Sequence, residues 1–315
     1  MAWSTDSKVW LSCALLILAA CGDGSGDDDG TAGEGAESGL PTTTASSSQG
    51  ETDDGISDTG MTDGGDKLDM PAGDDGTAET GDECMQDVDI VFVMDVSTTM
   101  GPFLDKLEAE IDVVDQALQA LDLPSAPHYG LVVFVDDTLI TNAGAPYTDV
   151  AQLRTDFETW NNFTSGNSQV ASGGSNTTWP ENSIDALYLA GSVFQWRAAD
   201  TTLRMIIHTT DDTFWNGPTT GNGIAIAHGF EETVDLLQSQ QIRVFSYAAL
   251  IGGSCNCEDV SMGWSTPYMG MTSMPEATGG AWFNIDEVLA DQISLSGSID
   301  ASVIDTMCTP YPPPD

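Results

Sequence analysis

The stretch 89–100 reads Asp-Ile-Val-Phe-Val-Met-Asp-Val-Ser-Thr-Thr-Met, and it decides the fold. Its apolar run, 90–94, has no polar residue on either face, which is typical of a central strand buried on both sides. The run ends at Asp95, and two hydroxyl residues, Ser97 and Thr99, follow at alternate positions. Ligands of open α/β sheets bind at the carboxyl ends of the strands, so these three side chains lie where a ligand is expected.

These side chains offer one carboxylate and two hydroxyls. Oxygen ligands of this kind suit a hard divalent cation such as Mg²⁺, which also keeps some of its waters. An alternative interpretation is that Asp95 and Ser97 cap the helix that starts near Pro102. We favour the cation site.

The rest of the chain alternates between apolar strands and amphipathic helices. Apolar residues at three- and four-residue spacing predict a helix from Leu104 to Leu121, which Pro124 ends. Further strands are expected at 129–135, 138–140 (an antiparallel edge), 203–209, 242–250 and after 280, further helices at 150–160, 183–196, 225–238 and from 287, and a polar loop at 161–180. This order predicts an α/β fold: a mostly parallel, Rossmann-like open sheet with helices on both faces.

The chain is strongly acidic. Its 315 residues include 50 Asp and Glu against 7 Lys and Arg, which gives a formal net charge of −43. Nucleic acids and anionic membrane surfaces would be repelled, so neither is expected as a partner. Much of the acid lies in the segment 22–83, which is poor in large apolar residues. Such a segment buries too little surface to offset the entropy of ordering, so we expect a disordered tether.

The first twenty residues have the features of an export signal. Lys8 is a weak basic start, and the apolar run 9–20 is shorter than the ~20 residues that span a bilayer. The run ends Leu-Ala-Ala-Cys at Cys21, which resembles the lipobox of bacterial lipoproteins, whose cysteine carries lipid. The alternative is an ordinary cleaved signal with an incidental cysteine. The chain is therefore expected to divide into a signal peptide (1–20), a lipidated cysteine with an acidic linker (21–83), one folded domain (84–308) and a tail (309–315).

Four ordered motifs between Cys84 and Cys308 resemble the von Willebrand factor type A family. The first is Asp-x-Ser-x-Thr at 95–99. The second, Gly-Gly-Ser-Asn-Thr-Thr-Trp-Pro-Glu at 173–181, is most similar to the metal loop of integrin β-type domains. The third is an apolar strand ending in Thr-Asp, 203–211, and the last is Thr-Gly-Gly at 278–280, before the final strand.

The resemblance implies a divalent-cation site, called in that family a metal-ion-dependent adhesion site. The residues of this site would be Asp95, Ser97, Thr99, Thr178, Glu181 and Asp211. The two hydroxyls of the first motif would bind the cation directly, and the two aspartates directly or through water. Whether Thr178 or Glu181 completes the site stays open. Integrin β-type domains carry an acidic pair for a second cation soon after the first motif, but Pro102 and Phe103 stand there, so only one site is carried over.

Some of these residues also have plainer interpretations. Asp211 and Asp212 would suit a solvated turn, and Glu181 would suit the first turn of a helix, where the dipole favours an acid. No phosphate loop, dinucleotide glycine pattern or Gly-x-Ser-x-Gly elbow is found. His208 lies in an apolar strand and is expected to be a core residue.

The sequence therefore predicts a lipoprotein of the bacterial cell envelope, at the outer membrane or cell surface. Its domain would be an adhesion or interaction module rather than an enzyme. It would bind a protein or glycan ligand that offers a carboxylate, through Mg²⁺ or else Mn²⁺ or Ca²⁺. The alternative is a metal-dependent hydrolase of the cell envelope.

Four cysteines follow Cys21, and an oxidising compartment predicts that they form disulfides. Cys84 precedes the first strand, whereas Cys255 and Cys257 follow a strand parallel to it and so lie at the opposite edge of the sheet. A strand spans ~17–20 Å, far more than the ~7 Å limit between bridged Cα atoms. We therefore predict the pairs Cys84–Cys308 and Cys255–Cys257.

The loop around Cys255 is also rich in methionine, with Met262, Met269, Met271 and Met274. Thiols and thioethers are soft ligands that suit Cu(I). We favour a disulfide with flexible methionine packing. An adaptable contact surface is a third interpretation.

Overall fold

The computed structural model describes residues 85–252 and 258–313, which all belong to one compact unit, Ala72–Asp315. The predicted signal peptide, Cys21 and the linker lie outside the described residues, and so do Cys84, Cys255 and Cys257. Among the described residues, no helix is both long and apolar enough to cross a membrane.

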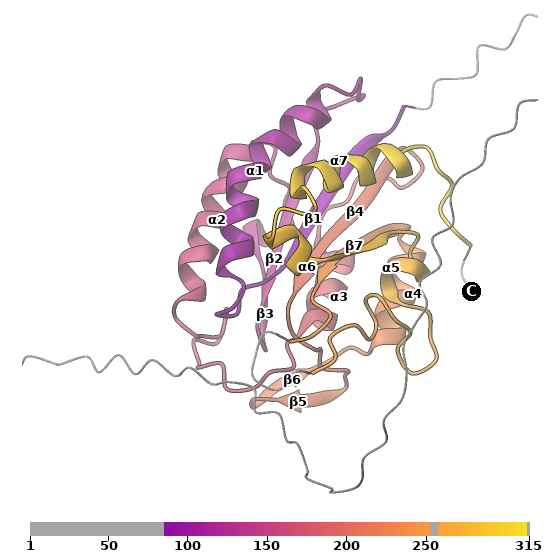
Figure 1. The fold of residues 1–315 in the computed structure, drawn as a ribbon. Coiled ribbons are helices and arrows are strands. Elements are labelled where there is room, and N and C mark those ends of the chain that lie inside the picture. Colours follow the sequence, from indigo (N-terminus) through magenta and orange to yellow (C-terminus); the bar gives the residue numbers. More distant parts are fainter. Residues whose placement is uncertain (1–84, 253–257, 314–315) are drawn as a thin grey trace, which may run out of the picture. The chain divides into compact units, whose positions relative to one another are not determined.

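The central sheet has six strands in the order β3-β2-β1-β4-β7-β8. Neighbouring strands run parallel, except that β3 is antiparallel to β2. The bounds are β1 Asp87–Asp95, β2 His128–Phe134, β3 Thr138–Ile140, β4 Thr202–Thr210, β7 Ile242–Ala248 and β8 Ala281–Asn284. β1 and β4 lie side by side at the centre (Figure 1) and are buried along almost their whole length, as the continuous apolar runs predict.

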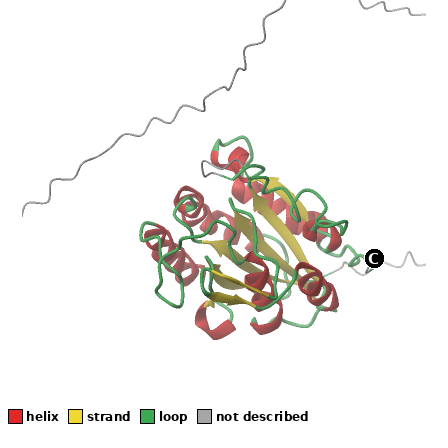
Figure 2. Cartoon of the chain, turned by 90° about the horizontal axis from the view of Figure 1, so that it is seen from below, coloured by secondary structure: helices red, strands yellow, loops and turns green. Residues whose placement is uncertain are grey.

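Two layers of helices enclose the sheet. On one face α1 packs against α2 and α7, and on the other α3 packs against α4 (Figure 1). The bounds are α1 Gly101–Gln119, α2 Val150–Thr164, α3 Ser183–Val193, α4 Phe230–Ser239 and α7 Leu295–Thr306, with the shorter η1 Thr141–Gly144, α5 Met274–Ala277 and α6 Ile285–Leu289. Figure 2 shows the strands between the helices. The predicted α/β architecture is confirmed.

The register of the parallel strands brings their carboxyl ends level. Asp95, the last residue of β1, pairs with Phe134 of β2, and Met94 pairs with Thr209 of β4. Residues that follow β1, β2 and β4 in three distant parts of the chain therefore meet at one edge. This is the edge where the sequence places the cation site.

The amphipathic stripe of α1 is confirmed, and its end is corrected. The buried apolar residues of α1 are Phe103, Leu104, Leu107, Ile111, Val114 and Leu118. The helix ends at Gln119, so Leu121 lies beyond it. α2 in turn continues to Thr164, and the polar loop predicted from residue 161 begins later.

The predicted helix over 225–238 is wrong in its first part. Residues 224–226 form β6 (Ile224–Ile226), which pairs antiparallel with β5 (Thr219–Gly221), and α4 begins only at Phe230. The turn between the strands is Asn222-Gly223, and both residues have positive φ (48° and 78°). Asn-Gly with positive φ at both positions is the preferred two-residue hairpin turn, so the sequence did contain the signal.

The segment after α7 contacts the amino end of the sheet. Cys308 is disulfide-bonded, and its backbone N–H donates to Oε1 of Gln86 (2.9 Å). The predicted partner, Cys84, lies outside the described residues, so the pairing stays a prediction. The Tyr311 hydroxyl donates to the carbonyl of Ile242 at the start of β7 (3.1 Å), so at least this part of the expected tail is held against the fold.

Candidate functional site at the carboxyl edge of the sheet

Asp95 is the anchor of the site. It is fully buried at the end of β1. Its Oδ1 accepts a hydrogen bond from the backbone N–H of Ser97 (2.8 Å), which bends the chain directly after the strand. Its Oδ2 accepts from the hydroxyl of Thr210 at the end of β4 (2.9 Å). One carboxylate therefore fixes both the first motif loop and the end of the neighbouring strand.

The hydroxyls of the first motif connect this loop to the loop after β4. Ser97 Oγ lies 3.3 Å from Thr99 Oγ1, and Thr99 Oγ1 donates to Oδ1 of Asp211 (2.9 Å). The structure thus brings Asp95, Ser97, Thr99 and Asp211 together, although 112 positions separate Thr99 from Asp211.

These hydroxyls do not cap α1. The N-cap residue of α1 is Met100, and no side chain makes a cap hydrogen bond there. The alternative interpretation, in which Asp95 and Ser97 cap this helix, is therefore wrong. The polar side chains of the motif face the edge of the sheet instead.

Glu181 reaches the site through backbone pairing with the loop after β4. Its N–H donates to the carbonyl of Thr213 (2.8 Å), and its carbonyl accepts from Trp215 (3.0 Å). The side chain is fully buried: Oε1 accepts from Asn176 Nδ2 (2.9 Å), while Oε2 has no hydrogen-bond partner. Glu181 is not the first-turn acid of α3, because Asn182 is the N-cap and the acid of that turn is Asp185.

Thr178 and Glu181 line one pocket, but the hydroxyl of Thr178 is bonded outside the first motif. This hydroxyl donates to Oδ1 of Asp136 (2.7 Å), not to any residue of the first motif. The pocket has a volume of about 370 Å³. It is lined by Ser97, Thr98, Thr99, Asn167, Asn176, Thr177, Thr178, Trp179, Glu181 and Asp212. The middle loop therefore forms one wall of the pocket and the first motif the other.

Sequence reasoning missed the residues that hold the middle loop. Asp136 and Asp137, expected only as a tight turn after β2, are both buried. Asp137 accepts hydrogen bonds from three successive backbone N–H groups, 170–172. Asp136 accepts from Thr178 and from Asn222 Nδ2 of the β5–β6 turn (2.9 Å). The available signal was an aspartate at the end of a continuous apolar run, 131–135, the same pattern that marks Asp95.

Asp212 was also missed. Asp211 and Asp212 lie in a bend and are half-buried, so they are only partly solvated. Burial, together with the charges of Asp95 and Asp211, raises the pKa of Asp212 to about 8. The sequence contained both carboxylates, but nothing in it showed which of them would line the pocket.

The carboxylates at this edge are buried close to one another, and this raises their pKa values. Burial and the charge of Asp211 raise the pKa of Asp95 to about 7. Burial, followed by the charges of Asp95, Asp136 and Asp212, raises the pKa of Glu181 well above its usual value. Burial also raises the pKa of Asp211. None of these carboxylates forms a salt bridge with a Lys, Arg or His among the described residues.

The residues present fit a divalent cation. Within the described part of the chain, no three or more His, Cys, Asp or Glu side chains form a metal-binding group by themselves. The donors here are mixed: the hydroxyls of Ser97 and Thr99 lie between the carboxylates of Asp95 and Asp211. Hard cations accept such oxygen donors. Oε2 of Glu181 has no hydrogen-bond partner, and burial together with neighbouring acids raises the pKa of Asp95 and of Glu181, so a positive charge at this edge would be favourable.

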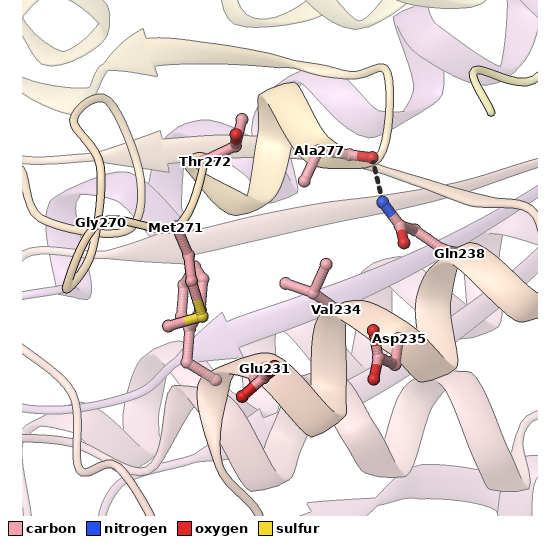
Figure 3. Close-up of a pocket in the computed structure, with 9 residues that line it drawn as sticks. Glu231, Val234, Asp235, Gln238, Gly270, Met271, Thr272 and Ala277 are labelled. Carbon is pink, nitrogen blue, oxygen red and sulfur yellow. Dashed lines mark hydrogen bonds between the residues drawn. The ribbon is translucent and has the colours of Figure 1, made fainter. Parts of the chain in front are cut away.

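A second pocket, of about 310 Å³, lies away from these carboxylates, between α4 and the loop at 270–272 (Figure 3). Figure 3 shows Met271 extending from that loop toward α4, and Gln238, whose Nε2 donates to the carbonyl of Ala277 (2.8 Å). Glu231 and Asp235 line this pocket. None of the six predicted cation-site residues does, so it is no part of the site.

No protein-family model matches the sequence, and no curated protein matches it either. Solved structures that match the chain include an aerotolerance-related membrane protein from Bacteroides fragilis, at 13% identity, over 71% of this chain and 100% of that chain, with a TM-score of 0.41. They also include the conserved hypothetical protein BatB from Bacteroides thetaiotaomicron (16% identity, 68% and 98% covered, TM-score 0.40). A third is proximal thread matrix protein 1 from the mussel byssus (17% identity, 66% and 45% covered, TM-score 0.37). At such low identities and TM-scores these similarities carry no argument about function, which rests on the geometry of the site.

Proposed function

We propose that the carboxyl edge of the sheet binds one divalent cation, with Mg²⁺ as the natural ion, and that the protein uses this cation to hold a carboxylate of a protein or glycan ligand. The observation that carries the proposal is the crowding of Asp95, Asp136, Glu181, Asp211 and Asp212 without a basic partner among the described residues. Like charges at such close quarters oppose folding unless a cation or protons neutralise them.

The chain supplies the first ligands through the von Willebrand-like motif. Ser97 and Thr99 would offer hydroxyl oxygens, and Asp95 and Asp211 carboxylate oxygens. Between the two middle-loop candidates, the structure favours Glu181, because its Oε2 is free while the hydroxyl of Thr178 is bonded to Asp136. When bound, the cation would supply the positive charge that attracts a ligand carboxylate.

The ligand would enter through the 370 Å³ pocket. Trp179 lines its wall and is 45% exposed, so a broad aromatic face stands beside the cation position. An aromatic ring with one solvent-exposed face suits contact with a sugar ring or an apolar side chain. This agrees with a protein or glycan ligand. Because His208 is fully buried in the core, it is not available as a base for the hydrolase alternative.

The location in the cell envelope belongs to the same proposal. It rests on the sequence 1–21 and on the lipobox-like ending at Cys21, both outside the described residues. A lipid chain anchors a protein by burying methylenes at ~0.8 kcal/mol each. The mass of the mature N-terminus tests this part, and an unmodified Cys21 would contradict it.

Titration of the full chain with Mn²⁺, followed by the electron paramagnetic resonance of the free ion, tests the cation site. We expect one tight site in the wild type at 0.15 M KCl, where salt screens weak binding to the acidic surface. Asp95→Asn removes the anchoring carboxylate and should weaken this site at least tenfold, which corresponds to about 1.4 kcal/mol.

Asp235→Asn is the matched control, since it removes one exposed carboxylate from α4, remote from the site. It should leave the tight site unchanged. Equal binding by the wild type and Asp95→Asn would refute the assignment. Equal losses in both variants would show that only the net charge matters.

A further inference from the structure

The turn of the β5–β6 hairpin lies against the middle loop of the cation site. In this turn, Asn222 donates from Nδ2 to Oδ2 of Asp136 (2.9 Å) and to the carbonyl of Ser175 (2.9 Å). Its Oδ1 accepts a hydrogen bond from the hydroxyl of Thr177 (2.7 Å). Both the amide nitrogen and the carbonyl oxygen of this one side chain therefore hold the middle loop and the end of β2.

The segment that Asn222 holds forms part of the cation site. Residues 176–178 line the 370 Å³ pocket. Asn176 lies between the two loop residues that bond to Asn222, and its Nδ2 donates to Oε1 of Glu181 (2.9 Å). Asn222 is therefore connected, through a single residue of the loop, to the carboxylate that we propose as a ligand of the cation.

The hairpin is itself held in place by close packing on Trp215. A Cβ atom at Gly221 would lie 2.5 Å from the Trp215 ring, so only glycine allows the hairpin to lie this close. The backbone N–H of Trp215 donates to the carbonyl of Glu181 (3.0 Å). The hairpin thus contacts the residue that holds the Glu181 backbone, and Asn222 extends this contact to the middle loop.

Only an amide satisfies all the partners of Asn222. A carboxylate of the same size has no N–H group to donate to Asp136 or to Ser175, and it would add a negative charge beside Asp136. Asn222 is followed by Gly223. An Asn-Gly pair loses its amide most readily, because glycine has no side chain to hinder attack by its backbone nitrogen.

We propose that Asn222 is a positioning residue of the cation site and that its deamidation opens the site; this inference rests on the proposed cation function. In the reaction, the backbone nitrogen of Gly223 forms a bond to Cγ of Asn222. The side-chain nitrogen leaves as ammonia and takes the proton of that backbone nitrogen. Water then opens the cyclic imide to aspartate or isoaspartate. Either product lacks the N–H groups that hold Asp136 and Ser175.

The closed loop should protect Asn222 from this reaction. Attack on Cγ requires the side chain to turn away from its partners, so the reaction proceeds from molecules in which the middle loop has opened. When the open form binds no cation, a cation at about ten times its Kd suppresses opening about tenfold by mass action. Cation binding and deamidation of Asn222 are therefore expected to oppose each other.

The rate of deamidation tests this coupling. The full chain is incubated at neutral pH with a chelator or with Mn²⁺, and peptide mass spectrometry follows the replacement of NH₂ by OH. With Mn²⁺ at about ten times its Kd, we expect Asn222 to react about tenfold more slowly than with chelator. Asn216-Gly217 is the control within the same molecule. Oδ1 of Asn216 accepts from the N–H of Phe230 at the start of α4 (2.7 Å), so its rate should not respond to Mn²⁺.

Asn222→Gly tests the positioning role without a change in charge. Glycine suits a turn position with positive φ, so the hairpin should be kept while the amide is removed. Residues that orient metal ligands are worth about 10–100-fold in metal affinity, so Mn²⁺ binding should weaken at least about tenfold.

Asn222→Asp copies one product of deamidation and should also weaken Mn²⁺ binding. By charge alone, the added carboxylate would strengthen the binding of a cation, so a weaker site reports the loss of position. Asn216→Asp is the matched control, because it makes the same change in charge at the other Asn-Gly pair. It should not weaken the site.

Separate outcomes would overturn the two proposals. A wild type without a tight Mn²⁺ site refutes the proposed function and, with it, the coupling. A tight wild-type site that Asn222→Gly leaves unchanged refutes only the positioning role, and so does a rate at Asn222 that Mn²⁺ slows no more than the rate at Asn216. With chelator present, equally fast deamidation of Asn222 in the folded chain and in urea would show that the loop does not hold this amide.

Discussion

The two ends of the central sheet hold buried charge in different ways. At the carboxyl edge, Asp95 and Glu181 are buried beside other acids and have no basic partner among the described residues. At the amino edge, Asp89 is equally buried, but Arg197 binds it: Nε donates to Oδ1 (2.7 Å), and the backbone N–H donates to Oδ2 (2.8 Å). A buried carboxylate is thus bound by an arginine at the amino edge, whereas at the carboxyl edge it has no basic partner among the described residues.

This difference separates side chains that serve the fold from side chains that serve a ligand. Removing the guanidinium from a buried carboxylate that it binds destabilises the folded state. A buried carboxylate that has no such partner already lowers the stability of the folded state. Substitutions at the two edges should therefore change the free energy of unfolding in opposite directions.

The largest effect is expected at the amino edge, from Arg197→Met. This change leaves Asp89 fully buried without its ionic partner, and removal of one member of a buried pair costs about 3–5 kcal/mol. Denaturant unfolding of the full chain measures the loss, and the slope of the transition shows whether the folded state is still the same.

Arg154→Met is the matched control for this prediction. Arg154 pairs with Asp112, but the two side chains are 47% and 38% exposed. Surface pairs contribute about 0–1 kcal/mol, so the control should lose little. Similar losses in the two variants would break the comparison, because burial of the carboxylate would then not be the cause.

The middle of the sheet should respond to acid. His208 of β4 is fully buried, its Nδ1 lies 2.9 Å from Ser246 Oγ, and it stacks on Phe134. Burial lowers its pKa to about 3. Below pH ~6.5 His208 is protonated in the unfolded chain but stays neutral in the folded chain. The free energy of unfolding therefore falls as the pH falls from ~6.5 toward 3.

Unfolding free energies at pH 7.0 and pH 5.0 measure this contribution. The wild type should lose about 2 kcal/mol more than His208→Gln over this interval, since carboxylates contribute equally in both. His228→Gln is the control, because its ring is 28% exposed beside Asp185. If His208→Gln does not fold, the titration of His208 by NMR in the wild type decides instead: a ring that becomes protonated above pH 5 contradicts the prediction.

The sequence predicted the parts of this protein that depend on neighbours in the chain. A continuous apolar run ending at Asp95 predicted β1 and the site loop, and the spacing of Leu104, Leu107 and Ile111 predicted α1. The strand order then placed Asp95 and Asp211 at one edge, because parallel strands end together. The Rossmann-like fold and the meeting of Asp95, Ser97, Thr99 and Asp211 at one edge follow from such local patterns, whereas the role of these residues as cation ligands stays a prediction.

The remaining features depend on contacts between distant segments. Asp136 is an ordinary turn residue until Asn222 from the β5–β6 turn and Thr178 from the middle loop donate to it. Trp264 looks like part of an open methionine-rich loop, yet it is fully buried against His208. No periodicity marks such residues, since their burial is set by segments that lie far away in the sequence.

The smallest expected effect, and the one with the opposite sign, belongs to Glu181→Gln. In the presence of a chelator this change should raise the free energy of unfolding by about 1 kcal/mol. The amide cannot ionise, so it avoids the cost of burying a charge beside Asp95, Asp136 and Asp212, the cost that raises the pKa of Glu181, and it keeps an oxygen for Asn176 Nδ2. With Mn²⁺ added, the wild type should become more stable than the variant. A ligand that binds only the folded state stabilises the wild type by mass action, and the variant has lost one oxygen donor.

Glu276→Gln, which changes an exposed acid on α5, should change stability by less than about 0.5 kcal/mol under both conditions. A loss of stability in Glu181→Gln with chelator present would mean that this carboxylate serves the fold, as Asp89 does, and the contrast between the two edges would then not extend to Glu181.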